Sequence, residues 1–445
     1  MATDQLEYCV IGGGIIGSWT ALHLARAGVR TVLMEQFPLP HTRGSSHGAS
    51  RVTRLMGDDN LAALEYSFAE WREMERLTGE TLLVTTGLVN LGLEGDSYLA
   101  KYMGIVKASG YPTEWLSEQE LAKKFPFLRY PGWGAASDPS GAILLAHKCV
   151  VAVQREFVRL GGRILHGSAQ ELLTLSADSV QVRTRLPSGE IKVMPFAKVA
   201  VCAGPWSKKL LPTCAHLLSA QAIPVTYWRE LPQTANGDAV IDAAIDAAPG
   251  ETAGGASGDA GGADAPAAAA VGSQHGSRHS AAAGCPVIYN ARLKNIYAVP
   301  SYEYAGLVKV LVHSGPAAEP DSRDVPDLQP VVDRVSAYVS EHMPLLEHRK
   351  PAICEVCMYT MTPDSKPLMD LCHPRVAVGT GYSGSGFKHS PASGRMISAL
   401  LLGTQDELPQ GFGLRRYRIS RFAEGDTHSL KDAGRLLDKA GRSML

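Results

Sequence analysis

Short apolar runs alternate with helix-like stretches along most of the chain. Residues 8–11 (YCVI) form the first such run, which is β-prone and predicts a buried strand. A helical stretch over residues 18–27 follows, and residues 30–35 predict a second buried strand that ends in an acid. Residues 198–206 predict a strand that runs into a turn, and residues 376–379 predict another strand. This alternation is typical of an α/β fold.

The segment between the first predicted strand and the helix is rich in glycine. Gly12, Gly14 and Gly17 have the G-x-G-x-x-G spacing, and Glu35 ends the second strand. Such glycines let the backbone turn tightly and approach a pyrophosphate at a helix N-terminus, and the acid accepts hydrogen bonds from a ribose. A glycine-rich turn in an unrelated α/β domain is the alternative. The complete order of strand, glycines, helix, strand and acid favours a Rossmann-like βαβ site for a dinucleotide.

A second strand-like segment, residues 306–313, carries a lysine among apolar residues. Val308, Val310 and Val312 alternate on one face and predict core packing. Lys309 and His313 fall on the opposite face. Taken alone, such a lysine would face solvent, because lysine is rarely buried.

The amino-acid composition of the chain changes over residues 234–284. This segment is rich in Ala, Gly, Ser and Asp and has almost no aromatic residues. It has too little apolar surface to form a core, which predicts a disordered insertion. A functional lid is the alternative, and the Ala-Gly repetition argues against it.

Composition narrows the class of protein further. The chain has 445 residues, 45% of them apolar and 20% charged, with a formal net charge of −1. These values are typical of a globular protein of several domains and argue against nucleic acid as a partner. No run of 18 apolar residues predicts a membrane span, and no signal peptide is expected. Eight scattered cysteines suggest a reduced, intracellular protein, and the lone C-x-x-C at residues 354–357 lacks the companions of a metal site.

Four further segments carry a resemblance to a known family. They are residues 41–54 (HTRGSSHGASRVTR), 306–313 (GLVKVLVH), 357–364 (CMYTMTPD) and 381–388 (GYSGSGFK). Their order and spacing resemble the monomeric sarcosine oxidase and L-pipecolate oxidase family of amine-oxidising flavoproteins. The resemblance implies FAD as cofactor and an oxidase that turns a small secondary or N-methyl amino acid into an imine, with oxygen as acceptor and hydrogen peroxide as product.

The resemblance also implies which residues bind the flavin. Cys357 matches the residue whose thiolate forms a thioether with the 8α-methyl carbon of the ring. Without the resemblance, a buried structural cysteine would be the favoured interpretation. Arg51 is expected near the ring, where its charge favours the reduced anion. The other cofactor-binding residues expected from the family segments are Ser45, His47, Ser50, Gly384 and Gly386.

Substrate and oxygen contacts follow from the same resemblance. Lys309 is expected over the flavin, where a fixed ammonium stabilises the superoxide that forms first. His313 and Tyr359 are expected to line the substrate pocket as catalytic residues, with Tyr297 as a further contact. The clamp for the substrate carboxylate is assigned to Arg54 and Lys388. At Ser385 the family usually carries a bulkier residue, often His, which leaves the pocket shape and the substrate open.

We expect a two-domain flavoprotein with the architecture of D-amino-acid oxidase: an FAD-binding domain over residues 1–86, 148–219 and 363–432, and a sheet-based substrate domain over residues 87–147 and 220–362. Residues 433–445 form a C-terminal tail whose last three residues, Ser443-Met444-Leu445, resemble a peroxisomal address without its basic middle residue. Peroxisomal import through its receptor is therefore expected, with the cytoplasm as the alternative, and the protein is expected to be a monomer.

Sarcosine and L-pipecolate are the leading substrates implied by the resemblance. Three alternatives stay open: an oxidase of a larger amine such as saccharopine or a glycated amino acid, a flavin dehydrogenase that passes electrons to a partner protein, and a catalytically silent flavoprotein. Sequence alone does not rank close substrates, because one methylene changes specificity by only about 1–3 kcal/mol.

Overall fold

The computed structural model describes residues 6–175, 178–232, 277–290, 292 and 296–422. Residues 234–276 of the predicted insertion lie outside the described residues. So does the predicted C-terminal tail with Ser443, Met444 and Leu445.

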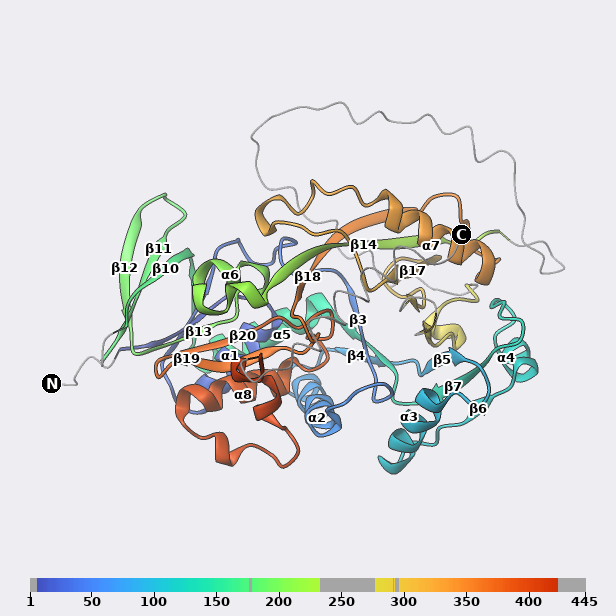
Figure 1. Cartoon of the computed structure of the whole chain (residues 1–445), viewed down its shortest axis with the longest axis horizontal. Coiled ribbons are helices and arrows are strands. Elements are labelled where there is room, and N and C mark those ends of the chain that lie inside the picture. Colours follow the sequence, from blue (N-terminus) through green and yellow to red (C-terminus); the bar gives the residue numbers. More distant parts are fainter. Residues whose placement is uncertain (1–5, 176–177, 233–276, 291, 293–295, 423–445) are drawn as a thin grey trace.

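A six-stranded sheet lies at one end of the long axis (Figure 1). Its order is β19-β20-β13-β1-β2-β9, and every neighbouring pair is parallel except β19 and β20. The strands are β1 (Tyr8–Ile11), β2 (Thr31–Glu35), β9 (Arg163–His166), β13 (Lys198–Val201), β19 (Leu368–His373) and β20 (Val376–Thr380). The four strands predicted from apolar runs are among them, which confirms the α/β class.

Both faces of this sheet are buried, which explains the near-continuous apolar runs. On β1, Val10 packs with the helices of one face, whereas Cys9 and Ile11 pack on the other side. The helices on the first face are α1 (Ile15–Arg26), α2 (Leu61–Thr78), α5 (Ala146–Arg159) and α8 (Ser390–Leu402). The second face is covered by a three-stranded antiparallel sheet and a short helix: β10 (Ser168–Leu175), β11 (Val180–Arg185), β12 (Ile191–Phe196) and α6 (Ser207–Leu210).

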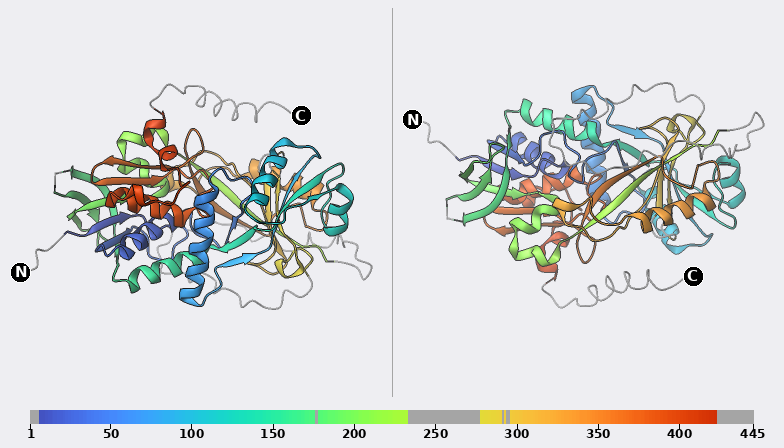
Figure 2. Two further views of the ribbon diagram at one scale, coloured as in Figure 1. Left: turned by 90° about the horizontal axis from the view of Figure 1, so that it is seen from below. Right: turned by 90° about the horizontal axis from the view of Figure 1, so that it is seen from above.

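A mixed eight-stranded sheet occupies the other end of the molecule (Figure 2). Its order is β18-β14-β17-β16-β15-β5-β7-β6, and only β15 and β5 pair in parallel. Its strands are β5 (Leu88–Gly92), β6 (Trp115–Leu116), β7 (Gly134–Asp138), β14 (Ser219–Arg229), β15 (Val287–Asn290), β16 (Ile296–Val299), β17 (Leu307–Val312) and β18 (Ile353–Met361). The helices α3 (Ser97–Ala108), α4 (Glu118–Lys124) and α7 (Gln329–His342) pack against its strands.

A small antiparallel sheet joins segments from both halves. Its order is β3 (Ser50–Thr53), β8 (Ala142–Leu145) and β4 (Leu83–Thr85). The strands of the six-stranded sheet lie in the ranges predicted for the FAD-binding domain, and those of the eight-stranded sheet lie in the substrate ranges apart from the first residue of β14. β8 comes from a predicted substrate range but pairs with strands of the other part. The division into two domains itself stays a prediction.

Residues 277–284 correct the predicted end of the insertion. They form a turn and a short 3-10 helix, Ala281–Ala283, instead of a disordered segment. His279 is fully buried, and its Nδ1 lies 2.9 Å from Oε1 of Glu230. The prediction of disorder was wrong for these residues, because it was based on amino-acid composition, which does not reveal contacts such as the one between His279 and Glu230.

Among the residues that the structure describes, no helix combines the length and the apolar character that a membrane crossing requires. Within the same part of the chain, no three His, Cys, Asp or Glu side chains come together as metal ligands.

Candidate active site

A cavity of about 810 Å³ lies between the two large sheets. Its walls come from the segments that follow the carboxyl ends of β1, β2, β13 and β20, and from residues on β17 and β18. This is where ligands bind in open α/β sheets. All predicted site residues except Gly17 line it: Gly12, Gly14, Glu35, Ser45, His47, Ser50, Arg51, Arg54, Tyr297, Lys309, His313, Cys357, Tyr359, Gly384, Gly386 and Lys388.

The glycine motif makes close contacts that exclude side chains. Gly12 has a φ of +107°, and a Cβ atom there would lie 2.4 Å from the Cys202 carbonyl oxygen. A Cβ atom at Gly17 would lie 1.9 Å from the carbonyl oxygen of Gly12. Gly17 therefore lets α1 pack against the loop after β1 and does not line the cavity.

Polar groups for a dinucleotide stand at the same end of the cavity. The amide of Gly13 donates to Oε2 of Glu35 at 2.7 Å, and the amide of Ile15 donates to Oγ of Ser46 at 3.0 Å. Burial raises the pKa of Glu35, but His41 and the backbone amides of Phe37 and Gly13 outweigh it and hold the pKa below its ordinary value. An ionised acid at the end of β2 and the N-terminus of α1 fit the ribose and the pyrophosphate of FAD.

Cys357 and Arg51 lie side by side deeper in the cavity. Arg51 Nη2 is 3.9 Å from the Cys357 sulfur, which is itself 3.9 Å from the Ser45 carbonyl oxygen. Arg51 also donates to the carbonyl oxygens of Ser45, His47 and Ser50 at 2.9, 2.6 and 2.6 Å. Burial opposes the charge of Arg51, yet nearby acidic groups, Cys357 foremost, raise its pKa. The guanidinium is thus a fixed positive charge beside the thiol.

Lys309 is buried, whereas the rarity of buried lysines predicted a side chain that faces solvent. Its Nζ donates to Oγ of Ser50 at 2.8 Å and to Oε1 of Glu303 at 3.0 Å. The valines of the opposite face of β17 pack in the core under α7, so the predicted alternation is correct, but both faces are covered. Burial lowers the pKa of Lys309.

His313, Tyr297 and Tyr359 form a cluster on the same wall. Nδ1 of His313 is 2.9 Å from Oη of Tyr359, and the ring centroids of His313 and Tyr297 are 4.6 Å apart. Burial, together with the charges of Arg54 and Lys388, lowers the pKa of His313 to about 3. The imidazole is neutral at physiological pH, so it can accept or donate a hydrogen bond but carries no charge.

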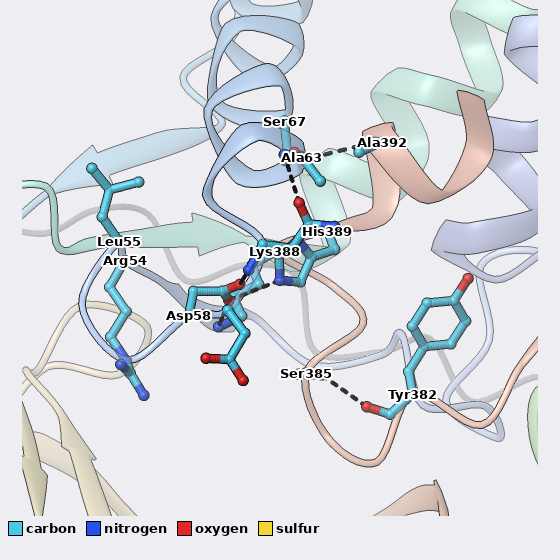
Figure 3. Close-up of polar contacts among 12 residues, drawn as sticks. Arg54, Leu55, Asp58, Ala63, Ser67, Tyr382, Ser385, Lys388, His389 and Ala392 are labelled. Carbon is cyan, nitrogen blue, oxygen red and sulfur yellow. Dashed lines mark hydrogen bonds and ion pairs between the residues drawn. The ribbon is translucent and has the colours of Figure 1, made fainter. Parts of the chain in front are cut away.

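Arg54 and Lys388 reach the cavity from two different loops (Figure 3). Nζ of Lys388 lies 2.6 Å from Oδ2 of Asp58, which also lies 2.8 Å from Nε2 of His389. Burial raises the pKa of Asp58, but Lys388 and His389 hold it well below its ordinary value. The Arg54 guanidinium donates to the Met56 carbonyl oxygen and lies 4.3 Å from the ring centroid of Tyr289.

The loop after β20 is packed against aromatic rings. A Cβ atom at Gly384 would lie 2.6 Å from the Tyr359 ring, and one at Gly386 would lie 2.7 Å from Tyr382. Ser385, where the family usually carries a bulkier residue, turns its hydroxyl to the Tyr382 carbonyl oxygen at 2.9 Å. These glycines are therefore required by contacts within the protein, beyond the predicted approach to the flavin.

Sequence reasoning missed three residues of this site: Ser46, Asp58 and Glu303. Ser46 lies inside the family segment at residues 41–54, and this position was the available signal; its contact with the N-terminus of α1 is seen only in the structure. The two acids lie in loops, and no local pattern marks them. A general requirement, that buried cations have counter-ions, could have prompted a search for them.

Comparison with known proteins agrees with this geometry. Residues 7–400 match the family model described as FAD dependent oxidoreductase (DAO). The chain is 31% identical to peroxisomal sarcosine oxidase of Mus musculus, over 95% of this chain and 97% of the relative, and 32% identical to that of Homo sapiens, over 94% and 97%. The crystal structure of L-proline dehydrogenase from P. horikoshii has the same fold, with a TM-score of 0.69 and 17% identity over 95% of this chain and 98% of that one. These similarities confirm the predicted fold class and the resemblance to sarcosine oxidases.

Proposed function

Since the chain belongs to the FAD dependent oxidoreductase family, we propose that it is an oxidase of small secondary or N-methyl amino acids such as sarcosine and L-pipecolate. The products are an imine and hydrogen peroxide. The observation that carries this proposal is the meeting of a buried lysine, Lys309, and two cations suited to a carboxylate, Arg54 and Lys388, in one cavity with the dinucleotide motif. Bound FAD would supply the two-electron redox chemistry that links the amino acid to oxygen.

The residues at the glycine-rich end of the cavity are suited to hold FAD. The N-terminus of α1 and Glu35 would take the pyrophosphate and the ribose. At the other end we propose Cys357 as the site of a thioether to the ring, because Cys357 lines the cavity and its sulfur lies 3.9 Å from Nη2 of Arg51. The test is to denature the purified yellow protein in acid: flavin retained in the pellet on a peptide with Cys357 supports the bond, and free FAD in the supernatant contradicts it.

The substrate would bind through its carboxylate. Arg54 can present two parallel donors and Lys388 an ammonium, so the amine end is directed to the neutral cluster of His313 and Tyr359. A neutral histidine beside the amine does not repel a protonated substrate, and it can hold the amine by hydrogen bonding. No strong protein base is required if the amine binds unprotonated.

Lys309 would act in the oxygen half of the reaction. The first electron transfer to oxygen makes an anion, and a fixed ammonium stabilises that charge without reorganisation. A Lys309→Met variant should therefore react slowly with oxygen while its flavin is still reduced by substrate without oxygen. Loss of the reduction step with normal oxygen reaction would contradict this role.

The experiment that tests the proposed function is a substrate screen with peroxide detection. Purified protein is mixed with sarcosine, L-pipecolate, L-proline, saccharopine and a glycated amino acid, and hydrogen peroxide is measured. We expect the first two to give the highest kcat/KM. If no amine gives peroxide, the proposed function is wrong.

The alternatives to this proposal differ in their expected results. A larger amine is the first, because Ser385 stands where the family usually carries a bulkier residue; saccharopine or the glycated amino acid would then give the highest kcat/KM. A dehydrogenase would be reduced by its amine but reoxidised slowly in air. Retention of the buried Lys309 argues against the dehydrogenase and against a silent flavoprotein.

We also propose a peroxisomal location, supported by the names of the mouse and human relatives and by the terminal Ser443-Met444-Leu445. An import receptor would be the partner that reads this end. A fluorescent protein fused to the N-terminus should accumulate in peroxisomes, and deletion of the last three residues should leave it in the cytosol. A diffuse signal from the full-length fusion would contradict the proposal.

A further inference from the structure

Glu303 lies in the connection between β16 and β17 and contacts the oxygen-activating lysine proposed above. Its Oε1 is 3.0 Å from Nζ of Lys309, and its Oε2 accepts a hydrogen bond from Oη of Tyr227 at 2.7 Å. The side chains of Glu303 and Lys309 are only 3% and 6% exposed. This is a buried ion pair with its acid held in place by a third group.

The other groups around Lys309 do not replace this acid. Ser50 offers a hydroxyl at 2.8 Å and a carbonyl at 3.4 Å, and the ring of Tyr227 lies 5.2 Å from the ammonium, but none of these carries a charge. Arg51 repels the ammonium, and burial opposes its charge. Glu355 is the second acid that favours the charged lysine.

Glu355 stabilises the charged form of Lys309 less than Glu303 does. The attraction between Glu355 and the ammonium raises the pKa of Lys309 less than the attraction of Glu303 does. It is also smaller than either of the two effects that lower this pKa, which are burial and the charge of Arg51. Burial raises the pKa of Glu355 itself, whereas the pKa of Glu303 is lowered despite burial because Lys309, Ser50 and Tyr227 stabilise its anion. Glu303 is thus the acid that stays ionised next to the lysine.

We propose that Glu303 is the positioning residue that keeps Lys309 protonated, and that it thereby sets the upper pH limit of the reaction with oxygen. The inference rests on the proposed function, because it assigns Lys309 to the oxygen step. Glu303 acts through Lys309 and needs no contact with the flavin. It belongs to a turn outside the four family segments, so the resemblance did not indicate it.

The first test is the pH profile of reoxidation. Enzyme reduced by substrate without oxygen is mixed with oxygenated buffer between pH 6 and 10, and the rate of flavin reoxidation is recorded. In Glu303→Gln the fall in rate at high pH should begin at least about one pH unit lower than in the wild type, a tenfold loss of proton affinity at Lys309. The matched control, Glu355→Gln, should shift the profile less. An unchanged profile in Glu303→Gln overturns the proposal.

A milder variant keeps the proposal testable if Glu303→Gln does not fold. Tyr227→Phe retains both charges and removes only the hydrogen bond to Glu303. It should shift the profile in the same direction by a smaller amount, since the unsupported acid is less stable as an anion. A shift to higher pH would contradict the proposal.

A second readout does not depend on turnover. The pKa of Lys309 is lower in the folded protein than its ordinary value of 10.5. Between the lowered pKa and 10.5, the unfolded chain therefore binds more protons at this lysine than the folded protein does. The free energy of unfolding rises with pH within this window. In Glu303→Gln this rise should begin at lower pH, and in the Glu303→Gln, Lys309→Met double variant it should disappear. If no amine reduces the flavin, the proposed function fails, but the unfolding data still test the pair. Identical pH dependence of unfolding in wild type and Glu303→Gln overturns the inference alone.

Discussion

The phenol oxygen of Tyr359 lies 2.9 Å from Nδ1 of His313. Tyr359 belongs to β18, His313 directly follows the last residue of β17, and β14 runs between these strands. Their contact spans the sheet on the wall of the cavity, and it fixes the orientation of an imidazole that burial keeps neutral. This wall of the cavity therefore carries a neutral polar group, although Arg54 and Lys388 are near enough for their charges to lower the pKa of His313.

Removing this contact should weaken catalysis without changing its pH dependence. Tyr359→Phe removes one hydrogen bond, worth about 0.5–1.5 kcal/mol, so kcat/KM should fall about 2- to 10-fold. Because the pKa of His313 is about 3, the profile above pH 5 should keep its apparent pKa values. Steady-state kinetics from pH 5 to 9 check this, with Tyr111→Phe at the surface as control. An apparent pKa near 6.5 that vanishes in His313→Gln would show that the imidazole titrates.

Stability should decrease as the pH falls below neutrality. Burial is the main cause that lowers the pKa of His23 to about 4 and those of His47 and His313 to about 3. Between pH 6.5 and 4 the unfolded chain takes up protons at these histidines and the folded protein does not. Each fully titrating histidine then reduces the free energy of unfolding by about 1.4 kcal/mol per pH unit.

Urea unfolding at pH 7, 6 and 5 measures this slope. His23 lies in α1, where its Nε2 donates to the Pro391 carbonyl oxygen at 3.1 Å. His23→Gln should flatten the slope, and the exposed control His216→Gln should leave it nearly unchanged. Equal slopes for wild type and His23→Gln would contradict the depressed pKa.

Arg54 and Lys388 should determine the affinity for the substrate carboxylate. Lys388→Met and Arg54→Met should each raise KM about 10- to 100-fold, because a hydrogen bond to a charged group is worth about 1.5–3 kcal/mol. The methyl ester of the substrate has no carboxylate, so the variants should bind it almost as well as the wild type does. Arg76→Met on the exposed face of α2 is the matched control. If the ester loses as much as the acid, the two cations do not bind the carboxylate.

Gly17→Ala tests the packing of α1 against the loop after β1. Helix propensity alone would make alanine better by about 1 kcal/mol. The new Cβ atom would lie 1.9 Å from the Gly12 carbonyl oxygen, so we expect a net loss of about 1–3 kcal/mol and a lower flavin content. Gly104 in α3 has open space around it, and Gly104→Ala should be neutral or stabilising. Urea unfolding and the ratio of flavin to protein absorbance report both, and equal effects of the two substitutions would refute the packing argument.

Local patterns in the sequence predicted the strand-helix-strand unit that carries the glycine motif, and the structure has this unit. The three glycines and Glu35 lie within one strand-helix-strand unit, so their spacing along the chain fixes their arrangement in space. Spacing along the chain also places Cys357 and Tyr359 on one face of β18, because side chains two residues apart in a strand point to the same side.

Contacts between distant loops could not be predicted in this way. Asp58 pairs with His389, 331 residues further along the chain, and only the tertiary fold brings them together. The burial of Lys309 likewise depends on Ser50 and Tyr227 from other strands, which alternation on β17 does not reveal. The sequence therefore indicated cations that the structure places around one cavity, but it did not indicate the acids that pair with them.

A single-turnover experiment tests the central claim, oxidation of an amino acid by this protein with oxygen as acceptor, most directly. Purified enzyme is mixed with L-pipecolate or sarcosine in the absence of oxygen, its flavin absorbance is followed, and oxygenated buffer is then added. The proposed oxidase predicts that substrate bleaches the flavin and that oxygen restores its colour rapidly, with one hydrogen peroxide formed for each flavin. A flavin that no amine bleaches, or one that is bleached but stays reduced in oxygenated buffer, would contradict it.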